Sequence, residues 1–242
     1  MNSNNEKLNP FQEGVVLAVD KPLGWTSFDV VNKFRYRLCK ALQVRKFKVG
    51  HAGTLDPLAT GVVVLCTGRA TKQIEALQAS KKTYITTLKL GETTPSFDLE
   101  TEVDKTYPTH HLTEELIRHT LTSFVGEQLQ VPPSFSACKV DGQRAYEQAR
   151  KGLEVTLAAK PITIYSVRLL CCQLPYIQVE IECGKGTYIR AFARDLGERL
   201  NCGAHLTELR RTQSGNYSVN NAITPDHFED FIKQTLETAT TK

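Results

Sequence analysis

The apolar segments of this chain are short, and their length limits the folds open to it. The longest uninterrupted runs are Val15–Val19 and Val62–Cys66. A helix that spans a bilayer needs about 20 consecutive apolar residues, so these runs predict short buried strands and no membrane segment. The first ten residues, MNSNNEKLNP, are polar, unlike a secretory signal. We therefore expect a globular, cytoplasmic protein with no membrane partner.

The cysteine content predicts reduced thiols rather than disulfides or a metal site. The chain has 242 residues and seven cysteines, an odd number in a sequence long enough to bury a core without cross-links. Cys202 and His205 stand at C-x-x-H spacing, but no second pair completes a zinc site, which favours buried thiols. No phosphate-loop or dinucleotide glycine motif is present. We expect neither a metal nor a cofactor.

Strand and helix patterns are mixed along the chain rather than alternating as βα units. Apolar runs and alternation predict strands over 14–20, 62–67, 82–90, 161–174, 176–183 and 205–211. Helical spacing predicts helices over 27–42, 70–79, 113–124, 189–200 and from Pro225 onward. This mixture indicates an α+β fold with one domain over residues 14–215, a polar tail over 1–13 and a terminal helix and tail over 216–242.

Residues 128–152 interrupt this rhythm. They contain Pro132-Pro133, a predicted hairpin turn at Asp141-Gly142, and a short helical stretch closed by Gly152. We expect them to form an inserted arm on the surface.

Charge is segregated along the chain. Residues 30–74 carry nine basic side chains and a single acid, Asp56, whereas residues 92–115 carry seven acids and a single base, Lys105. A basic stretch indicates a face for a polyanion and the acidic stretch a face turned away from it, although a solvated helix surface gives the same pattern. A lone carboxylate among cations is either a structural cap or a group held ionised for chemistry.

Asp56 lies in a segment dense in turn-forming residues. Residues 49–61, VGHAGTLDPLATG, contain three glycines and Pro57, which predicts a tight loop that feeds the buried strand after it. Glycines let the backbone approach a bulky group closely, and Pro57 restricts the direction in which Asp56 projects.

The segment GHAGTLDPLATG resembles the corresponding loop of the TruB family of tRNA pseudouridine-55 synthases. Four further matches follow the family order: Asp20-Lys21-Pro22, Lys82-Thr83-Tyr84, Lys185-Gly186-Thr187-Tyr188-Ile189-Arg190 and Leu209-Arg210-Arg211. The resemblance extends from about Gly14 to Gly215. Many members also carry a C-terminal RNA-binding module of the PUA type, and we expect none here because only about thirty residues follow Arg211.

The resemblance implies a fold and a reaction. The fold is a central, mostly antiparallel mixed sheet flanked by helices, with an inserted arm that clamps RNA. The reaction converts the uridine at position 55 in the TΨC loop of tRNA to pseudouridine, by flipping the base, breaking its glycosidic bond and rejoining the uracil through carbon 5. No cofactor is implied. The catalytic carboxylate is assigned to Asp56, either as nucleophile or as base toward the sugar.

The same resemblance assigns five substrate-binding residues. Arg190 is implied to oppose the upward pKa shift of a carboxylate buried under a base, Tyr84 to stack on the flipped base, and Tyr188 to assist proton removal from carbon 5. His51 is implied to occupy the space that the base vacates, and Leu209 to wall the pocket. Lys21-Pro22 is expected to support the site from behind. The implied partner is the TΨC stem-loop, bound by a monomer without an obligate protein partner.

Two other functions fit part of the sequence. An RNA-binding or tRNA-folding module would need the basic stretch but would gain nothing from a carboxylate that faces RNA phosphates. A synthase guided to other RNAs, like the eukaryotic relatives, is disfavoured because the chain is short and has no extensions for docking partners.

Overall fold

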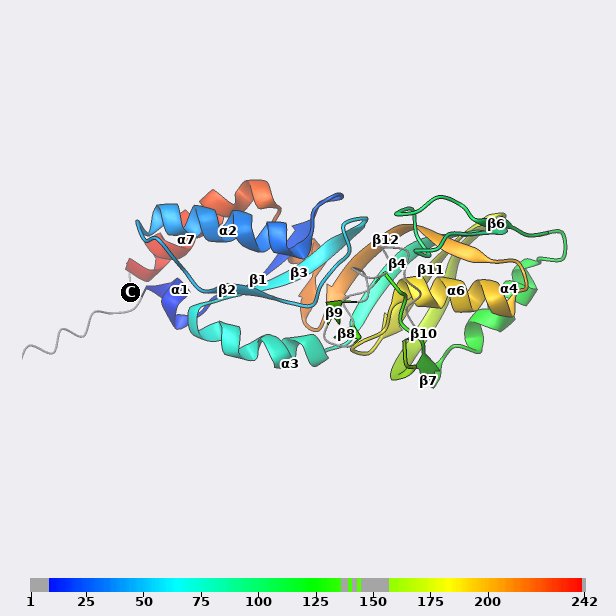
Figure 1. The fold of residues 1–242 in the computed structure, drawn as a ribbon. Coiled ribbons are helices and arrows are strands. Elements are labelled where there is room, and N and C mark those ends of the chain that lie inside the picture. The colour runs from blue at the N-terminus through cyan, green and yellow to red at the C-terminus, as the bar shows by residue number, and fades with distance from the viewer. Residues whose placement is uncertain (1–8, 136–138, 141–142, 145–156, 241–242) are drawn as a thin grey trace, which may run out of the picture. The chain divides into compact units, whose positions relative to one another are not determined.

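The computed structural model describes residues 9–135, 139–140, 143–144 and 157–240. Contacts between residues divide the chain into two compact units (Figure 1). The first unit comprises residues 1–80 together with 211–242, and the second unit comprises residues 81–210. Strand β12 (Ala204–Ser214) contains the point where the chain passes from the second unit to the first. No helix in the described ranges has the length and apolar character needed to cross a membrane.

The sheet of the first unit is built around β3 (Ala59–Thr67), the most deeply buried strand of the unit. Both β1 (Val16–Lys21) and β2 (Val49–Ala52) pair with it in antiparallel register. The end of β12 also borders β3, and the short β13 (Tyr217–Ser218) pairs with β12. The apolar run at residues 62–66 is thus the predicted buried strand, at the centre of this sheet.

Phenylalanine rings hold the helices of the first unit together. Helix α2 (Ser27–Ala41) lies beside α7 (Phe228–Thr240) (Figure 1). The Phe34 and Phe228 rings meet edge to face, with their centroids 5.0 Å apart. Helix α1 (Pro10–Glu13), within the stretch predicted as a polar tail, buries Phe11 completely. The remaining helical segments are the 3-10 helix Gly68–Gln73, α3 (Ile74–Ala79), and the 3-10 helices Val219–Asn221 and Pro225–His227.

The loop predicted over 49–61 is shorter in the structure. Its first residues form β2, which pairs with the far end of β3, and its last residues already belong to β3. Gly61 lies inside β3 at φ 101°, where a Cβ would come within 2.2 Å of the Arg211 carbonyl oxygen. That close approach of two backbones explains a glycine within a strand, which sequence alone indicates as part of a turn.

The second unit is an antiparallel sheet covered by two helices. Its strands follow the order β12, β4, β11, β10 and β7, and its helices are α4 (Glu114–Thr122) and α6 (Ile189–Arg199). The other strands of this sheet are β4 (Lys82–Leu90), β7 (Gly126–Gln130), β10 (Lys160–Gln173) and β11 (Tyr176–Cys183). Two small antiparallel pairs lie outside it: β5 (Glu92–Thr93) with β6 (Lys105–Thr106), and β8 (Lys139–Val140) with β9 (Gln143–Arg144).

These elements confirm the predicted α+β class and the mostly antiparallel sheet. Alternate residues of β4 and β11 are buried, as expected for strands packed on one face. The ring of Phe192 on α6 lies 4.7 Å from that of Phe124, which follows α4. Of the predicted arm, β8 and β9 pair on either side of residues 141–142. That turn and the predicted helical stretch before Gly152 lie outside the described residues.

The aromatic cluster gives a stability prediction. Phe34 is fully buried, whereas Phe28 on the same helix is 59% exposed. Phe34→Ala removes ring contacts to three other phenylalanines and should lower the free energy of unfolding by about 3–5 kcal/mol. Phe28→Ala is the matched control and should change it by less than about 0.5 kcal/mol. Urea denaturation followed by circular dichroism measures both, and equal losses in the two variants would contradict the packing described here.

Candidate active site

Asp56 lies in the short loop that connects β2 to β3 in the first unit, and its side chain is half-buried. The Asp56 carbonyl accepts a hydrogen bond from the Ala59 amide at 3.1 Å, which closes the turn into β3. The main chain on both sides of Asp56 is bonded to side chains from distant parts of the sequence. We call residues 53–57 the Asp56 loop.

Arg211 holds the first part of the Asp56 loop. Its side chain is 1% exposed, and its guanidinium donates to the carbonyl oxygens of Gly53 at 3.1 Å, Thr54 at 3.3 Å and Val62 at 2.7 Å. A guanidinium carries five N–H donors in a fixed plane, so one side chain can bind three carbonyl oxygens at once. Arg211 thus ties the loop to the strand that follows it.

Ser27 holds the residue directly before Asp56. The Ser27 hydroxyl accepts the Leu55 amide at 2.8 Å and donates to the Leu55 carbonyl oxygen at 3.2 Å. Both residues are buried. Ser27 is the first residue of α2, whose N-cap is Thr26, so the start of this helix fixes the loop as well as the helix itself.

Lys21 holds the residue directly after Asp56. Its side chain is fully buried at the end of β1, and its ammonium donates to the carbonyl oxygens of Trp25 at 2.6 Å, Pro22 at 3.0 Å and Pro57 at 3.3 Å. The Pro57 oxygen also accepts the Gly24 amide at 2.9 Å. Three main-chain oxygens thus satisfy the three donors of the Lys21 ammonium, and through these bonds Lys21 supports the loop next to Asp56.

The charges around the Asp56 loop influence one another. Burial lowers the pKa of Lys21 to about 8; the negative charges of Asp56 and Asp29 oppose this shift, and the positive charge of Arg211 adds to it. Because the ammonium is still mainly protonated at neutral pH, its charge favours the ionised form of Asp56. An ionised carboxylate is the state that the implied reaction needs.

His51 lies on β2, ahead of the Asp56 loop. Its Nδ1 atom is buried and has no hydrogen-bond partner among the described residues. Burial lowers the pKa of His51; a hydrogen bond to the Gly53 main chain opposes this shift, and the charge of Arg211 adds to it. The ring is therefore neutral at physiological pH, with a polar atom that can serve a ligand.

The second unit carries the other four predicted residues. Tyr84 is 8% exposed on β4 opposite Ile181 of β11, and Leu209 is half-buried on β12. Tyr188 is the N-cap of α6, and Arg190 follows in its first turn. The structure thus places His51 and Asp56 in one unit and these four residues in the other.

Arg190 has an acidic partner that sequence reasoning missed. Its Nε lies 3.6 Å from the Asp98 carboxylate, and both side chains are nearly buried. Arg190 also donates to the Phe135 carbonyl oxygen at 2.8 Å and the Ser96 carbonyl oxygen at 3.4 Å. Asp98 belongs to the acidic stretch predicted to face away from a polyanion, and its sequence context gives no signal of burial. The expected pairing of Arg190 with Asp56 stays a prediction.

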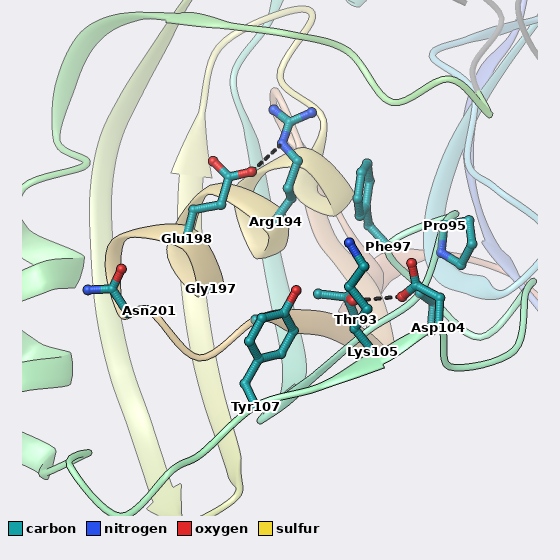
Figure 2. A pocket seen from close by; sticks show the side chains of 12 residues that line it. Thr93, Pro95, Phe97, Asp104, Lys105, Tyr107, Arg194, Gly197, Glu198 and Asn201 are labelled. Atoms are coloured by element: carbon teal, nitrogen blue, oxygen red, sulfur yellow. Dashed lines mark hydrogen bonds and ion pairs between the residues drawn. The ribbon is translucent and has the colours of Figure 1, made fainter. Parts of the chain in front are cut away.

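A cavity of about 580 Å³ lies beside α6 in the second unit (Figure 2). One wall is the segment 93–97, whose Ser96 carbonyl binds Arg190, and another carries Tyr107. Two pairs of its polar side chains interact: Arg194 with Glu198 at 4.0 Å and Thr93 with Asp104 at 2.6 Å. Within the described ranges, no cluster of His, Cys, Asp and Glu side chains is arranged to hold a metal ion.

Known structures share this fold. The chain matches the protein in a crystal structure of the archaeal box H/ACA sRNP Nop10–Cbf5 complex with a TM-score of 0.66 and 26% identity, and that in a Cbf5–Nop10–Gar1 complex with 0.69 and 28%. The matches cover 95% of this chain but only 57% and 60% of those chains, less than two thirds of their length.

The family models define the class as a pseudouridylate synthase. The TruB family pseudouridylate synthase N-terminal domain matches residues 40–189, and the tRNA pseudouridylate synthase B C-terminal domain matches residues 190–241. Proteins named tRNA pseudouridine synthase B from Parabacteroides distasonis and Phocaeicola vulgatus are 57% and 58% identical over 93% of this chain and 96% and 95% of their own length. This chain belongs to the TruB family, which confirms the resemblance seen in its motifs.

The charge coupling in the first unit predicts how activity depends on pH. As the pH rises through about 8, Lys21 loses its proton and with it the positive charge near Asp56, so the isomerisation rate should fall. Asp29→Asn removes a negative charge that raises the pKa of Lys21 but keeps an oxygen to cap α2, so the fall should begin at lower pH. Single-turnover rates from pH 6.5 to 9 on RNA labelled with tritium at uridine carbon 5 measure both. A wild-type rate that stays flat to pH 9 would contradict the coupling.

Proposed function

We propose that this chain is the tRNA pseudouridine-55 synthase that isomerises the uridine at position 55 in the TΨC loop. Membership of the TruB family and relatives named tRNA pseudouridine synthase B, matched over nearly their whole length, support this function. The reaction breaks the bond between uracil N1 and the sugar, turns the base and forms a bond from carbon 5 to the same sugar carbon. Carbon 5 loses a proton and N1 gains one, so no cofactor is consumed.

The structural observation that best supports this proposal is the fixed main chain of the Asp56 loop. Side-chain donors fix the main chain at Gly53, Thr54, Leu55 and Pro57. A solvent-exposed turn needs no such fixation, whereas a group that reacts at one sugar carbon must be held within a fraction of an ångström. Asp56 acts as nucleophile or as base toward the sugar, and both routes require its ionised form.

The second unit supplies the groups that we assign to the base. A stacked uridine is out of reach of a carboxylate, so the base must be flipped out at a cost of a few kcal/mol. Stacking on Tyr84 returns about 1–3 kcal/mol, which offsets this cost. Tyr188 assists removal of the proton from carbon 5, Arg190 keeps the carboxylate ionised, and Leu209 walls the pocket. His51 fills the space that the base leaves.

The exposed basic side chains after the middle of α2 are the proposed phosphate contacts. Arg35 donates to the Val49 carbonyl oxygen at 3.0 Å and Arg37 is paired with Glu229, so both serve the fold. The side chains left for RNA phosphates are exposed and follow one another over a short stretch: Lys40, Arg45, Lys46 and Lys48. Contacts of this kind position an RNA by its backbone rather than by its sequence.

We further infer that the protein acts as a monomer in the cytoplasm. Its proposed substrate is found there, and all six cysteines within the described ranges are free thiols.

The essential role of Asp56 is tested by Asp56→Asn. The amide keeps the shape of the carboxylate but can neither attack the sugar carbon nor act as a base, so tritium release from a labelled TΨC stem-loop should stop. RNA affinity should stay within a few fold, because we place phosphate contacts elsewhere. Turnover above a protein-free blank would refute the assignment. A variant that loses RNA binding and turnover together would instead favour a structural role for Asp56.

Tyr84→Leu tests the stacking role. If the base stacks on Tyr84 mainly after it has flipped, the variant should lose about tenfold in single-turnover rate and little in the dissociation constant of the stem-loop. Leu keeps an apolar side chain on the buried face of β4, and thermal unfolding reports whether the strand is intact. Equal losses in rate and affinity would contradict stacking after flipping.

A further inference from the structure

Gln130 makes an unusual contact with Tyr188. It is the last residue of β7 and is 3% exposed. Its side-chain oxygen accepts the Tyr188 amide at 2.9 Å, and its side-chain nitrogen donates to the Tyr188 carbonyl oxygen at 3.2 Å. One buried side chain therefore binds both main-chain polar groups of a single residue, as a neighbouring strand would.

This contact falls where α6 begins. The first amides of a helix have no partner within the helix, and Tyr188, the N-cap, makes no side-chain capping bond. Gln130 supplies a partner for the Tyr188 amide, while the Tyr188 carbonyl also accepts the Phe192 amide at 3.0 Å in the first turn. Gln130 thus fixes where the helix starts, and Arg190 lies two residues further on.

The residues after Gln130 hold the same turns of α6. The Val131 carbonyl oxygen accepts Arg194 at 3.0 Å, and the Phe135 carbonyl oxygen accepts Arg190 at 2.8 Å. Residues 130–135 therefore contact Tyr188, Arg190 and Arg194 through four hydrogen bonds, and three of the four reach a side chain or main chain that we place at the substrate.

We propose that Gln130 is a positioning residue for the isomerisation, which sets the main chain of Tyr188 and, through the start of α6, the guanidinium of Arg190. The inference rests on the proposed function, in which Tyr188 and Arg190 act at the substrate. Gln130 acts only through these two residues.

The chemistry of the contact explains why glutamine suits this position. The site needs an acceptor and a donor side by side, which a carboxamide provides and an ionised carboxylate does not. An ionised glutamate would place an oxygen against the Tyr188 carbonyl oxygen and push the helix start away. A displacement of about 1 Å costs about 10²-fold in rate when reacting groups must be aligned.

Gln130→Glu tests the proposal with a change that pH can reverse. At pH 8.5 the ionised side chain should lower the single-turnover rate of tritium release by about 10–100-fold relative to wild type, with the stem-loop dissociation constant within about threefold. Near pH 5.5 a protonated glutamic acid again offers an acceptor and a donor, so the ratio of variant to wild-type rate should rise. The charged groups that surround position 130 are Lys160, directly opposite it on β10, and Arg190 and Arg194 on α6, which are paired with Asp98 and Asp195.

Two further variants serve as controls. Gln130→Met removes both hydrogen bonds at every pH, so it should show the same loss without recovery. Gln128 lies two residues earlier on β7, and its side-chain nitrogen donates to the Phe124 carbonyl oxygen at 2.6 Å, away from Tyr188. Gln128→Glu makes the same chemical change on the same strand and should leave the rate within about twofold at each pH.

The outcomes separate this inference from the proposed function. An inactive wild-type protein would overturn both. An active wild type with Gln130→Glu and Gln130→Met within about twofold of its rate would overturn the positioning role alone, as would a loss without recovery at low pH in a folded Gln130→Glu variant. If the variants do not fold, hydrogen exchange of the wild-type Tyr188 amide decides: protection supports the contact, and exchange as fast as in an unstructured peptide overturns it.

Discussion

The proposed site depends on hydrogen bonds from buried side chains to the main chain of the Asp56 loop. Buried carbonyl oxygens must find a partner, and the six-residue connection between β2 and β3 does not supply enough donors from its own backbone. Lys21, Ser27 and Arg211 supply them instead, from the end of β1, the start of α2 and the end of β12. These elements are far apart in sequence, so the loop reaches its shape only once the first unit has folded around it.

The same hydrogen bonds offset the energetic cost of burying the two cations, Lys21 and Arg211. A charged group removed from water is costly unless polar atoms replace its hydration. The ammonium of Lys21 and the guanidinium of Arg211 each bind three carbonyl oxygens, and the negative charge of Asp56 lies close enough to raise the pKa of Lys21. The carboxylate of Asp56 therefore favours the charged form of Lys21, whereas the positive charge of Arg211 opposes it.

The sequence predicted the elements whose signals are local. Helices α2 and α4 lie within the predicted ranges 27–42 and 113–124, and β11 spans Tyr176–Cys183 as the alternation indicated. It did not predict β2, because residues 49–52 become a strand only through pairing with residues 64–67, and three glycines indicated a turn. The six candidate site residues came from motif resemblance rather than from periodicity. Asp98 and Gln130 were missed because an acid among acids and a glutamine in a strand carry no mark of the partners that bury them.

In both units, hydrogen bonds to the main chain hold the proposed site residues in place. In the first, side chains of Ser27, Lys21 and Arg211 bind the main chain beside Asp56; in the second, Gln130 binds the main chain of Tyr188, and the Phe135 carbonyl receives Arg190. Because these hydrogen bonds are made to the main chain, they fix where Asp56 and Tyr188 lie and leave the side chains of these residues available for the reaction. A neutral substitution at Ser27 or Gln130 should therefore alter geometry without altering charge, and its first effect should be on rate rather than on affinity for RNA. This distinction separates residues that hold the site from residues that react in it.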